Sequence, residues 1–505
     1  GTNIHFKINL PRNLRVTGAY LCMENDNGPV CRDSMFWCGQ QDASNEWWEC
    51  DYTPKTPGLY FYYFEILTWS GTMRLSRVQG GEAVLGGMER WQLTVYRHDY
   101  TSPDWPAGGI MYQIFPDRFA SSGIKKENVP SDRHGHADWL EEPEWRPNER
   151  GEVLNKDFFG GDLRGIEEKL PYLKELGVTC LYLNPIFESH SNHRYDTIDY
   201  HSVEPDIGTE EELKTLIAEA HALGLRVMID AVFNHCGAKC ALWQDVLEKG
   251  PQSDYYHWFC VNRWPIDAQT HATKRGDYFS FAFVDNMPKF DTSEPDVMEY
   301  LTGIAKHWVC EWKVDGIRFD VGNEISHAFL KHLRLELKKC NPKLFLLGEI
   351  WHDAFPWLLG DEYDSTMNYP FLACVNNFWA DKTQSGTDFM HGINQCYSMY
   401  YEQVNRVLFN LLDSHDTDRL MERCHGNADM FLAQLTVLFT MQGAPGIYYG
   451  TEIGMDGGGT KANRKCMPWE EIDAGSFAEL TGQVKQLIAM RRQYPQTRSG
   501  KVVWD

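Results

Sequence analysis

The feature that most constrains the fold is a regular alternation of apolar runs and amphipathic segments between residues 110 and 450. The intervening segments, such as EELKTLIAEAHALG at 211–224, repeat apolar residues at the three- and four-residue spacing of helices. Eight such runs in order favour a closed (β/α)8 barrel over a doubly wound sheet, which would also accept several βα units. The eight runs are IMYQIF (110–115), VTCLYLNPIF (178–187), LRVMIDAVFNH (225–235), KVDGIRFD (313–320), LFLLGEIW (344–351), DSTMNYPF (364–371), VLFNLLDSHD (407–416) and GAPGIYYG (443–450).

The flanking regions have different patterns. Residues 1–104 contain short strand-like runs separated by Gly, Asn, Asp and Pro, which predicts an N-terminal β-sandwich. The barrel then spans 105–493, and its connection at about 236–291 is long enough to form a small inserted domain after the third strand. Residues 494–505 follow the last helix and are expected to begin a C-terminal β segment.

Composition limits the classes of partner. The net charge of −23, from 71 acidic and 48 basic residues, disfavours nucleic acid and acidic membranes as partners. No apolar run reaches the roughly 18 residues of a membrane helix. Fourteen cysteines without a CxxC pair favour a reducing, cytoplasmic location and predict no metal ligand set. The chain begins at Gly1, so a removed leader remains an open alternative.

Polar side chains follow four of the predicted strands at the end where barrel enzymes carry their chemistry. Any one of them alone is more often a helix cap or a packed histidine, but capping does not account for polar clusters at four strand ends. The polar residues are Asp230, Asn234 and His235 after the third strand, Arg318 and Asp320 in the fourth, Glu349, Trp351 and His352 after the fifth, and His415 and Asp416 after the seventh.

Two of these carboxylates are placed to cleave a glycosidic bond, one as nucleophile and one as acid/base. Arg318 lies two residues before Asp320, so both side chains point to the same side of the strand and the arginine is expected to lower the pKa of Asp320. Glu349 follows the apolar run LFLLG, and burial there is expected to raise its pKa.

The motifs DAVFNH, GIRFD, GEIW and DSHD, in this order, resemble the four signature regions of the α-amylase family of glycoside hydrolases (family 13). NMPKFD at 286–291, DVGNE at 320–324, YQIFPDRF at 112–119 and HRYDTIDY at 193–200 resemble the neopullulanase, cyclomaltodextrinase and maltogenic amylase subgroup. The resemblance covers about residues 105–493. It implies a TIM barrel with domain B after strand 3, an N-terminal β-sandwich, and a C-terminal β-domain that this chain lacks or has in truncated form.

The resemblance assigns roles to individual residues. It implies that Asp320 is the nucleophile, Glu349 the acid/base and Asp416 the third carboxylate, which holds hydroxyls of the distorted sugar. The residues expected to contact substrate are Arg318, His235 and His415 around the reacting glucose, Tyr195 stacked on it, and Asn323, Glu324 and Trp351 toward the acceptor side.

The implied activity is retaining hydrolysis of α-1,4 glucosidic bonds in starch, maltodextrins, cyclodextrins or pullulan, with cleavage of α-1,6 bonds left open. A transglycosylase with the same residues and a non-catalytic glucan-binding relative are the alternatives. No cofactor is expected to be required. Calcium, which many family members bind, would here use Asp162 and the Gly160 carbonyl. The N-terminal domain is expected to mediate a homodimer or to bind glucan through Trp47 or Trp48.

Overall fold

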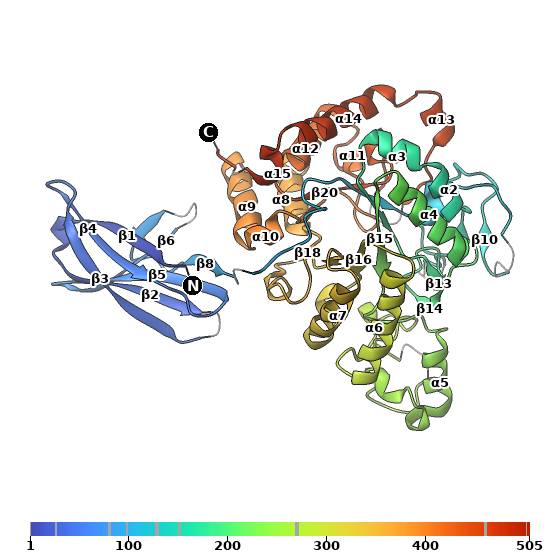
Figure 1. Ribbon diagram of the computed structural model, residues 1–505, viewed down its shortest axis with the longest axis horizontal. Helices are drawn as coiled ribbons and strands as arrows, with labels where there is room; N and C mark the ends of the chain where they lie inside the picture. The colour runs from blue at the N-terminus through green and yellow to red at the C-terminus, as the bar shows by residue number, and fades with distance from the viewer. Residues whose placement is uncertain are drawn as a thin grey trace. The chain divides into compact units, whose positions relative to one another are not determined.

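The computed structural model describes residues 2–25, 28–78, 82–96, 99–126, 131–149, 153–267, 272–458, 462–500 and 502–504. Its contacts divide the chain into two compact units, one of residues 1–101 with 387–402 and one of residues 102–386 with 403–505 (Figure 1). The boundary between the two units after residue 101 lies near the domain boundary expected after residue 104. Among the described residues, no helix combines the length and apolar character needed to cross a membrane.

The first unit is a β-sandwich, as predicted. Strand β3 pairs with β2 through residues 30–35 and with β4 through residues 36–40, so it passes from one layer into the other. Apolar residues from both layers, including Leu10, Leu21 and Ile66, form one core. The strands are β1 (Ile4–Pro11), β2 (Val16–Asn25), β3 (Val30–Gln40), β4 (Asn45–Tyr52), β5 (Gly58–Thr68), β6 (Gly71–Arg77), β7 (Ala83–Leu85) and β8 (Trp91–Val95).

Residues 387–402, which the sequence placed in the barrel, belong to the first unit. They comprise most of α9 (Gly386–Ser398) and the start of α10 (Glu402–Asn405). The Tyr401 hydroxyl donates to the Val95 carbonyl over 3.0 Å, and the Tyr401 ring packs 5.3 Å from that of Tyr96. These contacts to the chain after β8 explain the assignment.

The second unit contains the predicted (β/α)8 barrel. Its strands are all parallel and pair in the order β18-β17-β16-β15-β12-β9-β20-β19. A parallel bridge between Met367 and Phe409 joins the two ends of this order and closes the barrel. The strands are β9 (Met111–Ile114), β12 (Cys180–Leu183), β15 (Arg226–Ala231), β16 (Gly316–Phe319), β17 (Phe345–Gly348), β18 (Ser365–Thr366), β19 (Phe409–Asn410) and β20 (Ala444–Tyr448).

Helices cover the outside of the barrel strands, which explains why the strands are apolar on both faces (Figure 1). Alternate strand residues such as Met111, Tyr182, Met228 and Leu347 pack together in the interior. The principal helices are α2 (Leu163–Glu168), α3 (Leu170–Leu176), α4 (Glu210–Ala222), α6 (Pro295–Cys310), α7 (His327–Cys340), α8 (Tyr369–Trp379), α12 (Ala428–Thr440) and α14 (Ala478–Gln493), with the shorter α1 (Pro116–Phe119), α11 (Leu420–Arg423) and α13 (Trp469–Asp473).

The predicted domain B leaves the barrel after β15 and returns at α6. It contains α5 (Ala241–Lys249) and short bridges such as Phe259 with Phe290. A bridge between His235 and Lys289 joins its two ends, so the returning chain lies beside the carboxyl end of β15. Domain B therefore contributes a wall at the strand ends.

Two smaller pairs of strands flank the barrel. Strands β10 (His134–Gly135) and β11 (Asp157–Phe158) are parallel, and β13 (Phe187–Ser189) pairs antiparallel with β14 (Thr197–Val203). The segment 494–505, expected to begin a β segment, instead contains the short helix α15 (Gln496–Ser499), and residues 502–504 have no regular structure.

Candidate active site

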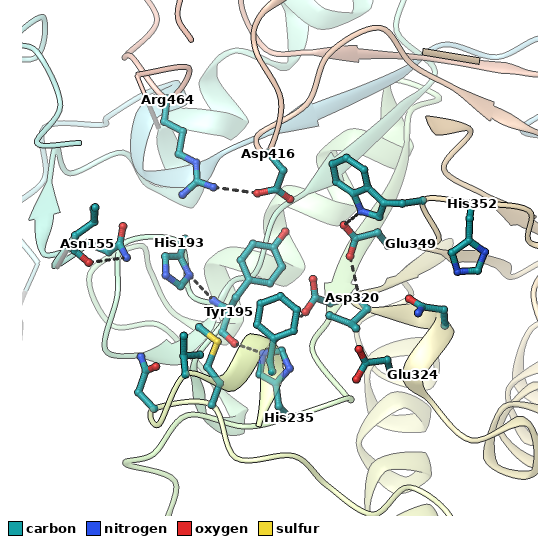
Figure 2. A pocket seen from close by; sticks show the side chains of 18 residues that line it. Asn155, His193, Tyr195, His235, Asp320, Glu324, Glu349, His352, Asp416 and Arg464 are labelled. Atoms are coloured by element: carbon teal, nitrogen blue, oxygen red, sulfur yellow. Dashed lines mark hydrogen bonds and ion pairs between the residues drawn. The ribbon is translucent and has the colours of Figure 1, made fainter. Parts of the chain in front are cut away.

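One cavity of about 710 Å³ opens at the carboxyl ends of the barrel strands. Asp320 follows β16, Glu349 follows β17, and Asp416 lies in the loop after β19, so parallel strands bring the three carboxylates to the same rim. Figure 2 shows their side chains facing this shared space together with Tyr195 and His235. The structure thus brings together the three residues that the sequence singled out as catalytic candidates.

Arg318 is the centre of the site. Its fully buried guanidinium binds Asp230 through Nη1 at 2.9 Å, Asp320 through Nη1 at 3.0 Å and Glu349 through Nη2 at 2.9 Å. Asp230 is also held by the hydroxyls of Tyr182 and Tyr195, which donate to its Oδ2 over 2.9 and 2.8 Å. One cation therefore positions three carboxylates that come from three consecutive strands of the barrel sheet.

Arg318 lowers the pKa of Asp320, as expected, but the net shift of this pKa is upward. Burial raises the pKa of Asp320 well above its ordinary value, and the carboxylates of Glu349, Asp230 and Asp416 add to this. Arg318 opposes the shift but is outweighed, because its single positive charge is shared among several buried acids. The sequence shows that Arg318 and Asp320 lie on the same side of one strand. It does not show that tertiary packing brings further carboxylates close to Asp320.

Glu349 is held by donors on two sides. Its Oε2 accepts the backbone N–H of Val321 over 2.9 Å, and its Oε1 accepts the indole N–H of Trp351 over 3.0 Å. Val321 has a left-handed backbone with φ of 47°, which is unusual for a β-branched residue and costs about 1–3 kcal/mol. The strained residue directly after Asp320 is thus the one whose amide orients Glu349.

The surroundings of Asp416 favour its ionised form. Burial raises its pKa, but His415, at 2.9 Å from Oδ2, and Arg464, at 3.3 Å from Oδ1, outweigh burial and hold the pKa well below its ordinary range. Arg464 comes from the loop after β20 and was missed in the sequence, since no strand end or motif marks it.

Tyr195 and His235 line the cavity, whereas His415 does not line it and packs against the Tyr195 ring. The Tyr195 ring stacks on His415 with centroids 5.3 Å apart, and its hydroxyl donates to Asp230. His235 lies with Nε2 3.1 Å from the Tyr195 carbonyl and 4.0 Å from Asp320. Burial lowers the pKa of His235 to about 3, so this imidazole stays neutral at ordinary pH and can donate one hydrogen bond.

The outer rim of the cavity combines an exposed aromatic side chain with an ion pair. Trp351 is half exposed and stacks on Tyr369 with a centroid distance of 3.7 Å. Glu324 binds Lys289 at 2.6 Å, and this lysine also donates to Asn234. The lining residues that sequence reasoning did not single out are Val153, Asn155, His193, Phe281, Val284, Asn286, Met287, Val321 and Arg464. Several of these lie in domain B or in loops, where no periodic pattern indicates which side chains face inward.

The residues suggested for calcium do not fit that ion. Asp162 caps α2, and its Oδ1 accepts N–H groups of Gly165 and Ser122 over 2.7 and 3.1 Å. Its Oδ2 accepts the Ser122 hydroxyl over 2.6 Å and lies 3.1 Å from the ammonium of Lys126. Calcium needs six or more oxygen ligands, whereas here a lysine charge already faces the buried carboxylate.

A closed parallel barrel with carboxylates gathered around a buried arginine at its carboxyl rim is the arrangement of an α/β-barrel enzyme site. The chain belongs to the alpha-amylase family, whose catalytic domain matches residues 113–499.

Similar proteins carry names that were expected for the subgroup. The chain is 44% identical over 409 residues to a cyclomaltodextrinase of Geobacillus thermopakistaniensis, which covers 80% of this chain and 66% of that protein. It is 40% identical over 462 residues to neopullulanase 2 of Thermoactinomyces vulgaris, covering 88% of this chain and 75% of that protein. The chain therefore spans just under two thirds of the first relative's length.

A solved structure of a cyclomaltodextrinase superposes with a TM-score of 0.73 and 33% identity, covering 99% of this chain and 83% of that one. This coverage includes the N-terminal unit. The predicted family, its subgroup and the predicted fold are confirmed by these similarities.

The charge balance around Asp320 is testable. Because the Glu349 carboxylate raises the pKa of Asp320, Glu349→Gln should lower that pKa by on the order of one unit. If Asp320 is the nucleophile, as the sequence predicts, activity is lost as pH falls through its pKa, so the acid limb of kcat/KM should move to lower pH. The measurement uses a glycosyl fluoride, whose leaving group needs no proton donor. An acid limb that does not move would contradict the effect of the Glu349 charge on the pKa of Asp320. Glu324→Gln, at the exposed rim of the cavity, is the control variant.

Proposed function

We propose that this chain is a retaining glycoside hydrolase that cleaves α-1,4 glucosidic bonds, and α-1,6 bonds where the acceptor side admits them. The observation that carries the proposal is the guanidinium of Arg318, which contacts Asp320 and Glu349 at 3.0 and 2.9 Å and so keeps both carboxyls at one cavity. Closely placed carboxyls suit the retaining reaction, in which they stand about 5–5.5 Å apart.

In the first step, Asp320 attacks the anomeric carbon while Glu349 gives its proton to the leaving glycosidic oxygen. The C–O bond to the leaving sugar breaks as the ester bond to Asp320 forms. In the second step Glu349 takes a proton from water, whose oxygen attacks the same carbon and releases Asp320 as a carboxylate. The mechanism needs negative charge on Asp320, which the adjacent Arg318 favours.

Further contacts support the binding of one glucose unit next to these two groups. Asp416, held ionised by His415 and Arg464, is available to accept hydrogen bonds from sugar hydroxyls. Neutral His235 donates its Nε2–H to the Tyr195 carbonyl and is thereby held beside Asp320, and the Tyr195 ring offers an apolar face. An oligosaccharide without charge also suits a chain with a net charge of −23.

The proposed substrates are starch, maltodextrins, cyclodextrins and pullulan. The names of two relatives, cyclomaltodextrinase and neopullulanase 2, support this range. The apolar rim formed by Trp351 and Phe281 supports binding of glucose faces beyond the cleavage point. The presence of Asp320, Glu349 and Asp416 at one cavity argues against a non-catalytic glucan-binding protein.

We expect Asp320→Asn to lower kcat by about 10⁴-fold or more on every substrate, because it removes the nucleophile and keeps the side chain's shape. Products from starch, pullulan and β-cyclodextrin should be profiled in parallel for the native chain. Circular dichroism of the variant checks that the fold is unchanged. Near-normal cleavage by a folded Asp320→Asn variant would refute the proposed role.

A second activity, transfer of the glycosyl group to another sugar, is favoured by the position of Glu324. Its carboxylate binds Lys289 at the acceptor side of the cavity, where it can accept a hydrogen bond from an incoming hydroxyl. We expect Glu324→Gln to lower the share of transfer products at high maltose at least two-fold, measured by chromatography. Total turnover is the internal control, because the variant keeps Asp320 and Glu349. An unchanged ratio of transfer to hydrolysis products would exclude a role of Glu324 in glycosyl transfer.

We also propose that the chain functions without calcium in a reducing, intracellular compartment. The ammonium of Lys126 beside Asp162 supports calcium independence. Buried thiols outside disulfides, such as Cys180, Cys236 and Cys424, support the compartment, as does a relative named intracellular maltogenic amylase in Bacillus subtilis.

A homodimer through the N-terminal unit remains our proposal. Phe36 and Trp37 are adjacent on β3, so their side chains point to opposite faces of the strand, and both are strongly exposed, which offers a partner an apolar side chain on either face. Light scattering should then give twice the chain mass of 58.4 kDa, and replacing both residues by serine should return the mass of one chain. Trp69→Ser, at another exposed aromatic residue, is the matched control. A single-chain mass for the native protein would reject the dimer.

A further inference from the structure

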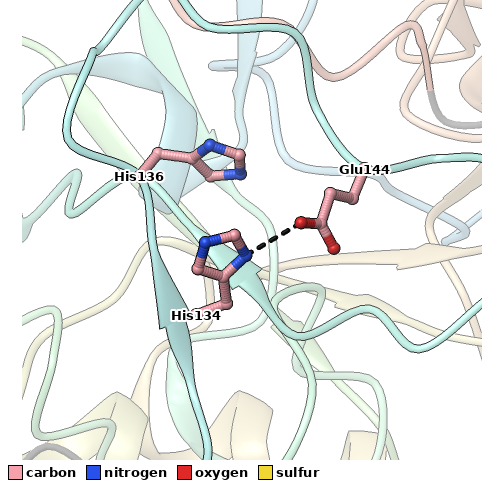
Figure 3. Close-up of side chains that lie close together, drawn as sticks. All are labelled: His134, His136 and Glu144. Atoms are coloured by element: carbon pink, nitrogen blue, oxygen red, sulfur yellow. Dashed lines mark hydrogen bonds and ion pairs between the residues drawn. The ribbon is translucent and has the colours of Figure 1, made fainter.

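Two histidines and a glutamate form a cluster that the proposed reaction does not use. His134 and His136 are two residues apart where the chain runs along β10, and Glu144 lies opposite them (Figure 3). One side-chain nitrogen or oxygen from each residue lies within 4.8 Å of the others. None of the three residues lines the cavity that holds Asp320.

His136 is held in the orientation of a metal ligand. Its Nδ1 lies 2.9 Å from Oε2 of Glu141, and a carboxylate can only accept, so Nδ1 carries the proton. A histidine that binds a metal typically donates its other ring N–H to such a carboxylate. The ring also stacks on Phe159 with centroids 4.0 Å apart, which prevents it from turning.

The remaining nitrogen of His136 lacks a hydrogen bond. Nε2 is buried in a side chain that is only 3% exposed, and it lies 3.6 Å from Asp157 Oδ2, beyond hydrogen-bond distance. With the proton on Nδ1, Nε2 presents a lone pair. A buried lone pair without a donor is unfavourable, and a metal ion would satisfy it.

The side chains of His134 and Glu144 are exposed and can adjust their positions to bind an ion. His134 and Glu144 are 61% and 56% exposed, and His134 Nδ1 lies 2.8 Å from Glu144 Oε1. Ligands about 2.0–2.1 Å from a tetrahedral zinc ion stand about 3.3 Å from each other. The ligand atoms, at most 4.8 Å apart, therefore need to approach one another by at most about 1.5 Å.

We propose that His134, His136 and Glu144 bind one divalent transition-metal ion of the zinc type, with water as a further ligand. Two imidazole nitrogens and a carboxylate suit zinc or cobalt, whereas calcium prefers oxygen ligands alone. Another cluster in the described part of the chain, His257 with Glu294 and Asp296, has a single histidine and no such preference.

The ion would connect a surface segment to the wall of the active site. His134 is the first residue of β10 and His136 follows that strand, which pairs with β11. The Glu144 amide donates to Asp157 in β11 over 3.0 Å. Asp157 in turn binds Asn192 and Arg118, and Asn155, two residues earlier, lines the cavity. The site is therefore structural, and its expected effect is on stability and not on the chemical step.

The test uses the full chain, free of any affinity tag and treated with a chelator that is then removed. Titration with Zn²⁺ in a calorimeter and with Co²⁺ in an absorption spectrometer should show one equivalent bound, with cobalt d–d bands of tetrahedral coordination. Zn²⁺ should raise Tm by a few degrees, whereas Ca²⁺ should leave it unchanged.

His134→Ala and Glu144→Gln change exposed side chains that the fold does not need, and each should weaken Zn²⁺ binding at least ten-fold. Glu141→Gln should weaken it about 10–100-fold, because it removes only the group that orients His136. His257→Ala is the matched control and should bind Zn²⁺ as the native chain does.

Failure of the native chain to take up one equivalent would overturn the proposal, as would unchanged binding in both His134→Ala and Glu144→Gln. Loss of binding in His257→Ala alone would place the ion elsewhere and also refute it. Hydrolysis assays with Asp320→Asn are independent of these measurements.

Discussion

The buried guanidinium of Arg318 is the interaction on which the site depends. Four carboxylates lie close together at the barrel rim, and isolated buried charges of one sign are strongly unfavourable. Arg318 contacts three of them directly, while Asp416 has its own partners in His415 and Arg464. The cluster can form because each strand end contributes one group to a closed ring of strands.

The cost of this arrangement is visible in the backbone. Val321 adopts a left-handed conformation that its branched side chain disfavours, and its amide is directed at Glu349. Domain B adds the opposite wall, since the bridge between His235 and Lys289 brings Phe281 and Met287 to the cavity. The strained backbone at Val321 and the inserted domain B thus both shape the same cavity. The rigid strands beneath them hold the carboxylates in place.

The cluster of His134, His136 and Glu144 shows how a surface segment can matter for the same cavity. Its neighbour Asp157 also binds Asn192 and Arg118, so buried hydrogen bonds connect the cluster to the segment that carries Asn155 at the cavity. The sequence did not indicate these three residues as metal ligands. Metal sites are predicted from ligands that lie close together in the sequence, and a loop separates Glu144 from the two histidines. Burial of the His136 side chain and its bond to Glu141 became evident only in three dimensions.

The sequence alone determined the barrel, because eight apolar runs with intervening helices admit few other folds, and each run was found as a strand. It also identified the polar residues at the strand ends, since parallel strands place their last residues on one rim. It could not place Arg464, Phe281 or residues 387–402, because loops and an outlying helix carry no periodic pattern. Only the tertiary structure decided the pKa of Asp320, because that value depends on the burial and the several charges that folding brings around one arginine.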